Sequence, residues 1–171
     1  TNVSGLALRN AGRFGVHVPW GAPMVRVAKD PAFGDPYQFH ADAQAASPLT
    51  AEVGKVLVGI TRTMSVPRRP KKESGAACRC VPAVTAPADA EQGAGGMIAA
   101  TVENGAGRMA FFTDTLVFQP FRIEHDDNAN LLINTFGWLT GRPVDSELRR
   151  RFRSGLFLTE ADLVAVAKDE Q

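Results

Sequence analysis

The sequence has almost no net charge and no long hydrophobic run, and each of these absences excludes a class of protein. Lysine and arginine total 19, and aspartate and glutamate total 18, which leaves a formal net charge of +1. Such a chain has no global field that draws it onto nucleic acid or a membrane surface, so binding of that kind has to be local. No apolar run reaches the roughly 20 residues that span a bilayer. The first residues are not a basic region followed by an apolar one. We therefore expect a soluble chain without membrane insertion.

The chain is also poor in cysteine. Cys78 and Cys80 are two positions apart, too close for an easy disulfide with each other and too few for a disulfide framework. Zinc sites usually place two residues between paired cysteines and need a second pair, so the sequence predicts no metal and no other cofactor. Scarce cysteine favours the cytoplasm or another reducing compartment.

What the sequence does contain is a globular composition, with 44% hydrophobic and 22% charged residues in 171. The most informative stretch is residues 105–141. Residues 109–113 are a short apolar run of strand length that ends at Asp114, which suits a buried strand of a parallel sheet. A polar loop follows, and after residues 126–128, which are typical of helix caps, apolar residues recur at helical spacing until Gly141. In α/β folds a strand, a loop and a helix in this order deliver polar side chains to the ligand-binding edge of the sheet.

A hairpin is predicted just before this stretch. Residues 97–103 have strand character and pair naturally with residues 108–113 across Asn104 and Gly105. This is the strongest hairpin signal in the chain.

A helical extension is predicted after Gly141. Asp145 or Ser146 caps a helix that runs to Phe152 and is dense in arginine. Thr159 followed by Asp162 resembles a capping box, and a last short amphipathic helix follows. These helices pack on the same core or reach a partner chain.

The loop before the central helix carries the candidate functional residues. His125 beside Glu124 is typical of a general base whose tautomer a carboxylate fixes. The alternative, which we favour because no nucleophile accompanies His125, is a solvated loop whose acids cap the next helix. Asp114 likewise has two possible roles in the sequence. One is to bind a ligand hydroxyl or a metal, and the other, which we favour, is to accept backbone N–H bonds in its own loop. If the protein binds a ligand, we expect the ligand-binding residues to be Asp114, His125, Asp127 and Asn128.

Two basic runs are a further candidate surface. Joined in space they would contact phosphates, whereas singly each is an exposed loop or a solvated helix face. Nucleic acid is therefore the weaker alternative as a partner. The residues concerned are Arg68, Arg69, Lys71, Lys72, Arg149, Arg150 and Arg151.

Four phrases of the sequence together resemble a known family. In chain order they are ALRNAGRFGVHV, SPLTAEVGKVLV, MIAATVENGAGRMAFFTDT and DDNANLLINTFGWLTG. They look like the later part of a class I glutamine-amidotransferase-like domain. More narrowly, they are similar to its noncatalytic branch, found in bacterial domains of unknown function, accessory proteins of gliding-motility ABC transporters, intraflagellar-transport subunits and the middle domain of some β-galactosidases. The positions that carry the branch's pattern are Gly107, Arg108, Asp114, Asp127, Asn128, Trp138 and Leu139.

The chain departs from the catalytic members of that family. Those members need a cysteine on a sharp turn between a strand and a helix, with His and Glu to activate it. Neither Cys78 nor Cys80 lies in a glycine-flanked turn. His125 lies in the corresponding region, but Glu124 precedes it and the family's His-Pro-Glu order is absent. The strands that carry the nucleophile in the family would precede Thr1.

The resemblance implies a three-layer, flavodoxin-like α/β sandwich with a mostly parallel sheet, an antiparallel hairpin near its end and a helical C-terminal extension. Residues 1–144 are then an amidotransferase-like domain that is incomplete at its N-terminus, and residues 145–171 are the extension. The expected function is a noncatalytic scaffold or ligand-binding domain in a larger assembly, whose other subunits include the segment with the first half of the fold. The alternative is a hydrolase or amidotransferase with His125 as base and a nucleophile from a missing segment or partner chain. A nucleic-acid-associated assembly subunit is the third possibility.

Overall fold

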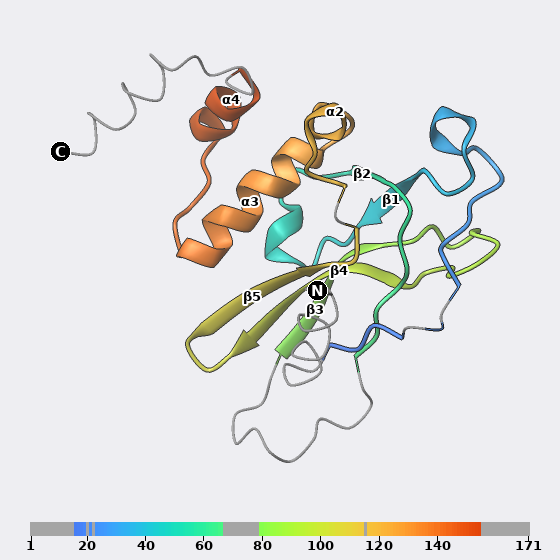
Figure 1. Cartoon of the computed structure of the whole chain (residues 1–171). Helices are drawn as coiled ribbons and strands as arrows, with labels where there is room; N and C mark the ends of the chain where they lie inside the picture. Colours follow the sequence, from blue (N-terminus) through green and yellow to red (C-terminus); the bar gives the residue numbers. More distant parts are fainter. Residues whose placement is uncertain (1–15, 20, 22, 67–78, 115, 155–171) are drawn as a thin grey trace, which may run out of the picture.

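The protein is built around a five-stranded sheet in which every pair of neighbouring strands is antiparallel (Figure 1). The computed structural model describes residues 16–19, 21, 23–66, 79–114 and 116–154. Residues 151–154 are described by their backbone alone. The order of strands across the sheet is β2-β1-β3-β4-β5. The strands are β1 (Phe39–Ala43), β2 (Lys55–Val58), β3 (Arg79–Thr85), β4 (Met97–Asn104) and β5 (Gly107–Phe112).

The predicted hairpin is formed by β4 and β5. Asn104 pairs with Gly107, and Gly105 turns the chain between them with a φ of 59°, a left-handed backbone that glycine adopts without strain. Within the described residues β5 pairs with β4 alone and forms one edge of the sheet.

The middle of the sheet is buried on both faces. Residues 97–102 of β4 are all buried. Ile98 belongs to the larger apolar cluster, which also contains Phe39 and Leu131, whereas Val102 belongs to a second cluster with Met64. β4 therefore lies between two parts of the core.

The sheet is curled into a half-barrel, and β3 is irregular at its centre. The register of β3 against β4 shifts between Pro82 and Val84 and again between Val84 and Thr85. Such irregularities bend a strand and increase its twist. Outside the five strands, Met64 forms an isolated antiparallel bridge with Met97, the first residue of β4.

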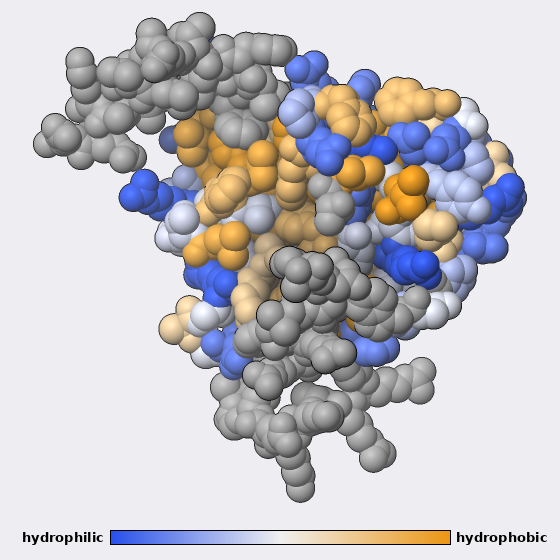
Figure 2. Space-filling model, in the orientation of Figure 1, coloured by the Kyte–Doolittle hydropathy of each residue, from blue (hydrophilic) through white to orange (hydrophobic). Residues whose placement is uncertain are grey.

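The α-helices in the described part of the chain follow the last strand. The long helix α3 (Asn128–Thr140) covers one face of the sheet, with Leu131 fully buried in the larger cluster (Figure 1). It ends as predicted at Gly141, whose φ is 72°. Figure 2 shows apolar side chains gathered along this helix and a more hydrophilic surface on the side of β1. The shorter helical elements are η2 (Ala32–Gly34), η3 (Pro48–Thr50), α2 (Pro120–Ile123) and α4 (Ser146–Ser154).

The expected flavodoxin-like sandwich with a mostly parallel sheet is wrong. Each strand pairing runs antiparallel, and residues 109–113, interpreted as a buried parallel strand, lie mainly in β5 at the edge of the sheet. A parallel pair needs a crossover connection of a dozen or more residues between its strands. Here a tight turn joins β4 to β5, and α2, α3 and α4 all come after β5.

Candidate functional site

The predicted site residues lie on the segment from β5 to α3, which contacts the outer edge of β2. β2 is the last strand of the sheet, so its outer edge has no strand partner in the part of the chain that the structure describes. Backbone N–H and C=O groups at such an edge need other partners. Three of the residues predicted to bind a ligand provide them, namely Asp114, Asp127 and Asn128.

Asn128 makes the largest number of these contacts and is fully buried. Its Oδ1 accepts a hydrogen bond from the N–H of Leu57 at 2.9 Å, and its Nδ2 donates to the carbonyl of Leu57 at 3.0 Å. The same Nδ2 lies 3.0 Å from the carbonyl oxygen of Val117 and 3.1 Å from that of Arg122. A carboxamide has two N–H donors and one carbonyl acceptor, so the polar atoms of this side chain are all in use. Asn128 takes the place that a neighbouring strand would have beside Leu57.

Asp127 binds the chain at the start of β2. Its Oδ2 accepts a hydrogen bond from the N–H of Gly54 at 2.9 Å, and its own N–H donates to the carbonyl of Lys55 at 3.1 Å. Its Oδ1 accepts a further hydrogen bond from Nδ2 of Asn130 at 3.2 Å. Asp127 is the residue before α3, yet its side chain makes no capping bond to the helix backbone. Its carboxylate instead holds a segment that is distant in the sequence.

Asp114 binds the chain just after β2. Only 3% of the residue is exposed, and its Oδ2 accepts a hydrogen bond from the N–H of Gly59 at 2.7 Å. Its Oδ1 accepts another from the N–H of Leu116 at 2.6 Å, within its own loop. This is the structural alternative that the sequence left open for Asp114.

His125, Glu124 and Asp126 lie on the exposed side of the loop. The His125 ring packs edge-on against Phe33, with 5.3 Å between the ring centroids. Asp126 Oδ2 lies 2.5 Å from Nδ1 of His40 and so connects the loop to β1. Among the described residues, the His125 side chain has no hydrogen bond to an acid, a hydroxyl or a thiol. The loop therefore gathers Asp114, Asp127 and Asn128 along β2 and leaves His125 outside that group.

Two further asparagines of α3 act in the same way and were missed in the sequence. Asn134 Nδ2 donates to the carbonyls of Leu49 and Ala51 at 2.9 and 2.8 Å, and Asn130 Nδ2 donates to the carbonyl of Glu52 at 3.1 Å. Asparagine is disfavoured inside helices because its side chain competes for backbone hydrogen bonds. Its repeated use at positions 128, 130 and 134 of one helix was the available signal.

Arg122 is a second residue that the sequence did not single out. It is 3% exposed, its Nη2 donates to Oε1 of Gln38 at 2.8 Å, and its guanidinium lies 5.3 Å from the centre of the Phe121 ring. Nε and Nη1 have no hydrogen-bond partner within the described chain. A Cβ at Gly59 would lie 2.5 Å from Nη2, so the buried arginine requires glycine there.

The basic runs do not form one exposed surface in the described residues. Arg149 is 8% exposed, and its Nη1 donates to the carbonyl of Ala51 at 2.8 Å, so it packs against the fold. Arg150 is paired with Glu147 on the surface of α4. Arg68, Arg69, Lys71 and Lys72 lie outside the described residues, as does the side chain of Arg151.

The same part of the chain also bears on metal binding and membrane insertion. No cluster of three or more His, Cys, Asp or Glu side chains there has the arrangement to hold a metal ion. No helix within the described ranges has both the length and the hydropathy to cross a bilayer. Cys78 lies outside those ranges, and Cys80 is half-buried in β3.

Comparison with known proteins adds a structural relative. No protein-family model and no curated protein matches the chain. Among solved structures it is similar to one described as "mmIFT52 N-terminal domain", from an intraflagellar-transport subunit. The TM-score is 0.60 with 17% sequence identity, over 85% of this chain and 60% of that chain. At this identity the likeness shows a shared fold, and the chain spans about 60% of the length of that domain.

This relative agrees with one part of the resemblance drawn from the sequence. Intraflagellar-transport subunits were among the proteins named there, and the structural match is to such a subunit. None of the comparisons supports a glutamine-amidotransferase-like domain.

Proposed function

We propose that the protein is a noncatalytic domain that serves as a scaffold within a larger protein assembly. The observation that best supports this is the use of Asp114, Asp127 and Asn128, which hold β2 in place through hydrogen bonds to its backbone and the residues that flank it. Freeing Asp114 or Asn128 for a substrate leaves a buried backbone group unsatisfied, at about 1–3 kcal/mol for each bond, whereas the bond from Gly54 to Asp127 is exposed. Asp114 and Asn128 are therefore poorly suited to chemistry.

The structural relative supports the role in an assembly. A domain of an intraflagellar-transport subunit shares the fold, and we extend its setting, a subunit of a complex, to this chain. We also propose that its partners include a segment of another subunit that packs against this fold.

The enzymatic alternative assigns a different role to His125, that of a catalytic base. A hydrolase or amidotransferase needs a nucleophile beside His125, supplied by another segment or chain. We propose instead that this exposed residue contacts a ligand or partner, as its packing against Phe33 on the surface suggests.

The test uses the full-length protein, tagged in its native cells and purified with its partners. We expect it to elute in a complex of fixed stoichiometry, and we expect His125→Ala to weaken the retention of a ligand or partner without abolishing any turnover of that complex. His17→Ala, the same change at an exposed histidine in another part of the chain, is the matched control. Loss of turnover in the His125→Ala complex, with composition and folding intact, would contradict the proposal and favour the enzyme.

A further inference from the structure

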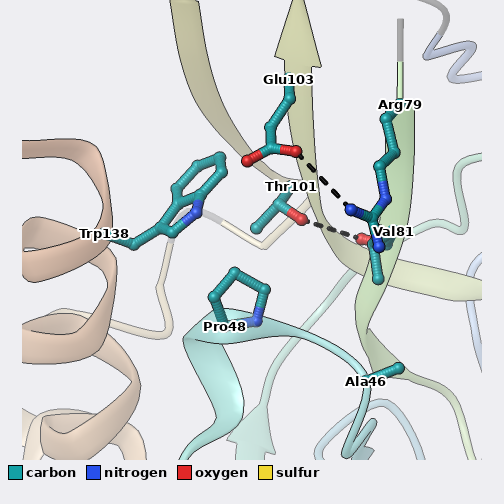
Figure 3. A pocket seen from close by; sticks show the side chains of 7 residues that line it. All are labelled: Ala46, Pro48, Arg79, Val81, Thr101, Glu103 and Trp138. Atoms are coloured by element: carbon teal, nitrogen blue, oxygen red, sulfur yellow. Dashed lines mark hydrogen bonds and ion pairs between the residues drawn. The ribbon is translucent and has the colours of Figure 1, made fainter. Parts of the chain in front are cut away.

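A groove of about 240 Å³ lies over β3 and β4, beside the C-terminal half of α3 (Figure 3). Val81 of β3 and Thr101 of β4 lie on its floor. Trp138 of α3 and Pro48 of η3 form its apolar walls. Ala46, which is exposed, lies at the margin of the groove on the side of η3. The groove is therefore open to a side chain that comes from outside.

β3 has an open edge beside this groove. β1 pairs with β3 at Thr85 and Val84, near the end of β3. Residues 79–81 pair with β4 on one side, and the described part of the chain places no strand on their other side. An unpaired strand edge is a template for an added strand, whose backbone hydrogen bonds supply affinity while its side chains supply specificity.

Arg79 and Glu103 are the charged residues that line the groove, and Arg79 is the one that favours an acidic partner. Arg79, Glu103 and Arg108 are neighbours across β3, β4 and β5, so one carboxylate lies between two cations. Arg108 is already used, since its Nη1 donates to the carbonyl of Trp138 at 2.8 Å. Arg79 Nη1 lies 4.0 Å from Glu103 Oε2, and 75% of the Arg79 side chain is exposed. A pair this long and this exposed contributes little, so Arg79 is available to a second carboxylate.

We propose that this groove receives an extended, acidic segment of another subunit, which adds as a strand to the open edge of β3. The inference rests on the proposed function as an assembly subunit and names the kind of partner. The segment places an apolar side chain between Trp138 and Pro48 and a carboxylate beside Arg79. Alternate residues of a strand face the same side, so the carboxylate lies two residues from the apolar side chain.

Binding is measured with the full-length protein and a fluorescein-labelled peptide of eight residues, by fluorescence anisotropy. The peptide has the sequence Val-Glu-Val-Phe-Val-Glu-Val-Glu, in which the phenylalanine and the glutamates face one side of the strand and the valines face the other. A second peptide has lysine in place of glutamate, and a third has the first sequence with N-methylated backbone amides. We expect the acidic peptide to bind, the basic one to bind about tenfold more weakly or less, and the N-methylated one to lose binding.

Two variants of the groove have matched controls in the same chain. Ala46→Trp fills the margin of the groove, and Arg79→Glu reverses its charge. Each is expected to raise the dissociation constant of the acidic peptide by about tenfold or more, which is a loss of about 1.4 kcal/mol of binding free energy. Ala45→Trp makes the same change at the adjacent exposed position, which does not line the groove. Arg150→Glu reverses a charge whose side chain is 71% exposed on α4. Both control variants are expected to bind the acidic peptide with a dissociation constant within about twofold of that of the wild type.

Several results would overturn the inference. They are equal binding of the acidic and basic peptides, equal binding of the N-methylated peptide, and no binding at millimolar peptide. In the native assembly, Ala46→Trp is expected to release the protein from its partner. A complex that keeps its composition with Ala46→Trp refutes docking at the groove and leaves the proposed function standing. A wild-type protein that elutes without any partner refutes the proposed function itself.

Discussion

Replacing Asn128 by alanine is expected to remove a large share of the protein's stability. The side chain is fully buried, and it supplies an acceptor to the N–H of Leu57 and two N–H donors that serve the carbonyls of Leu57, Val117 and Arg122. Its loss leaves buried backbone groups without partners and opens a cavity beside β2.

The expected cost follows from these contacts. One acceptor and two N–H donors, shared among the four contacts, amount to three full hydrogen bonds. At roughly 1–1.5 kcal/mol each, with unsatisfied groups left behind, their loss lowers the free energy of unfolding by about 3–5 kcal/mol. Single domains are stable by about 5–15 kcal/mol, so the alanine variant lies near the limit of folding. Asn128→Asp is therefore the more informative change, because it keeps the shape and the acceptor and loses both donors.

The pH dependence of Asn128→Asp adds a test. Burial and the facing carbonyl oxygens raise the pKa of a carboxyl at this position in the folded state. Its stabilising contribution is then present below the unfolded pKa of about 3.9 and is lost as the pH rises through the raised folded value. Relative to the wild type, the variant is expected to be least stable at neutral pH and to recover towards acid.

Urea denaturation followed by tryptophan fluorescence and circular dichroism measures both effects. Glu124→Ala, at an exposed position of the same loop, is the control and is expected to change the free energy of unfolding by less than about 0.5 kcal/mol. An Asn128→Ala protein within about 1 kcal/mol of the wild type would refute the role given to this side chain.

Three further predictions concern the packing and charge of single residues. Gly59→Ala is expected to lower the free energy of unfolding by about 1–3 kcal/mol in urea denaturation, because a Cβ there lies 2.5 Å from Nη2 of Arg122. Gly141→Ala is expected to cost about 1–2 kcal/mol in thermal melts, because φ is 72° at the end of α3. The hydrogen bond from the Tyr37 N–H lowers the pKa of the Asp35 carboxyl below its ordinary value of 3.8. Its contribution to stability is therefore complete above pH 3.8 and is lost as the pH falls through the lower folded pKa, which an NMR titration of Asp35 measures.

Each of these predictions has a control. Gly21→Ala introduces a Cβ with nothing within 4 Å and is expected to change stability by less than about 0.5 kcal/mol. A Gly59→Ala protein as stable as Gly21→Ala would show that Arg122 moves without cost. Gly141→Asn, which tolerates a left-handed backbone better than alanine, is expected to restore part of the lost stability. Acid unfolding that is identical in the wild type and in Asp35→Asn would contradict the effect of that carboxyl.

The local elements were readable from the sequence because they depend on neighbouring residues. Gly105 indicated the turn of the β4–β5 hairpin, and Gly141 indicated the end of α3. Asp145 indicated the start of α4, and its Oδ1 accepts a hydrogen bond from the N–H of Leu148 at 2.7 Å. In each case the signal and the structure lie within a few positions of each other.

The direction of the strands was not readable, for a physical reason. Strands of a parallel sheet are usually buried on both faces and read as continuous apolar runs, whereas antiparallel strands often alternate. Residues 109–113, interpreted as a buried parallel strand, lie mainly in the antiparallel edge strand β5. Ala110 and Phe112 pack against one apolar cluster and Met109 and Phe111 against the other, so this run lacks that alternation. The pattern of burial was therefore mistaken for a pattern of strand direction.

The role of the candidate site was hidden for a different reason. Asp114, Asp127 and Asn128 have the residue types of a ligand site and of helix caps, and the sequence offers no way to choose a distant backbone partner for them. Their partners lie 55, 73 and 71 positions away. The choice between binding a ligand and closing a strand edge depends on the tertiary fold alone.

That separation also bears on how the protein is made. The bonds that close the edge of β2 connect Leu57 to Asn128 and Gly54 to Asp127, across 71 and 73 residues. At a translation rate of about 5–20 residues per second, β2 leaves the ribosome about 4–14 s before the residues that cover it. During that interval the outer edge of β2 lacks the partners that the finished chain gives it, so its backbone groups are open to pairing with other unfinished chains.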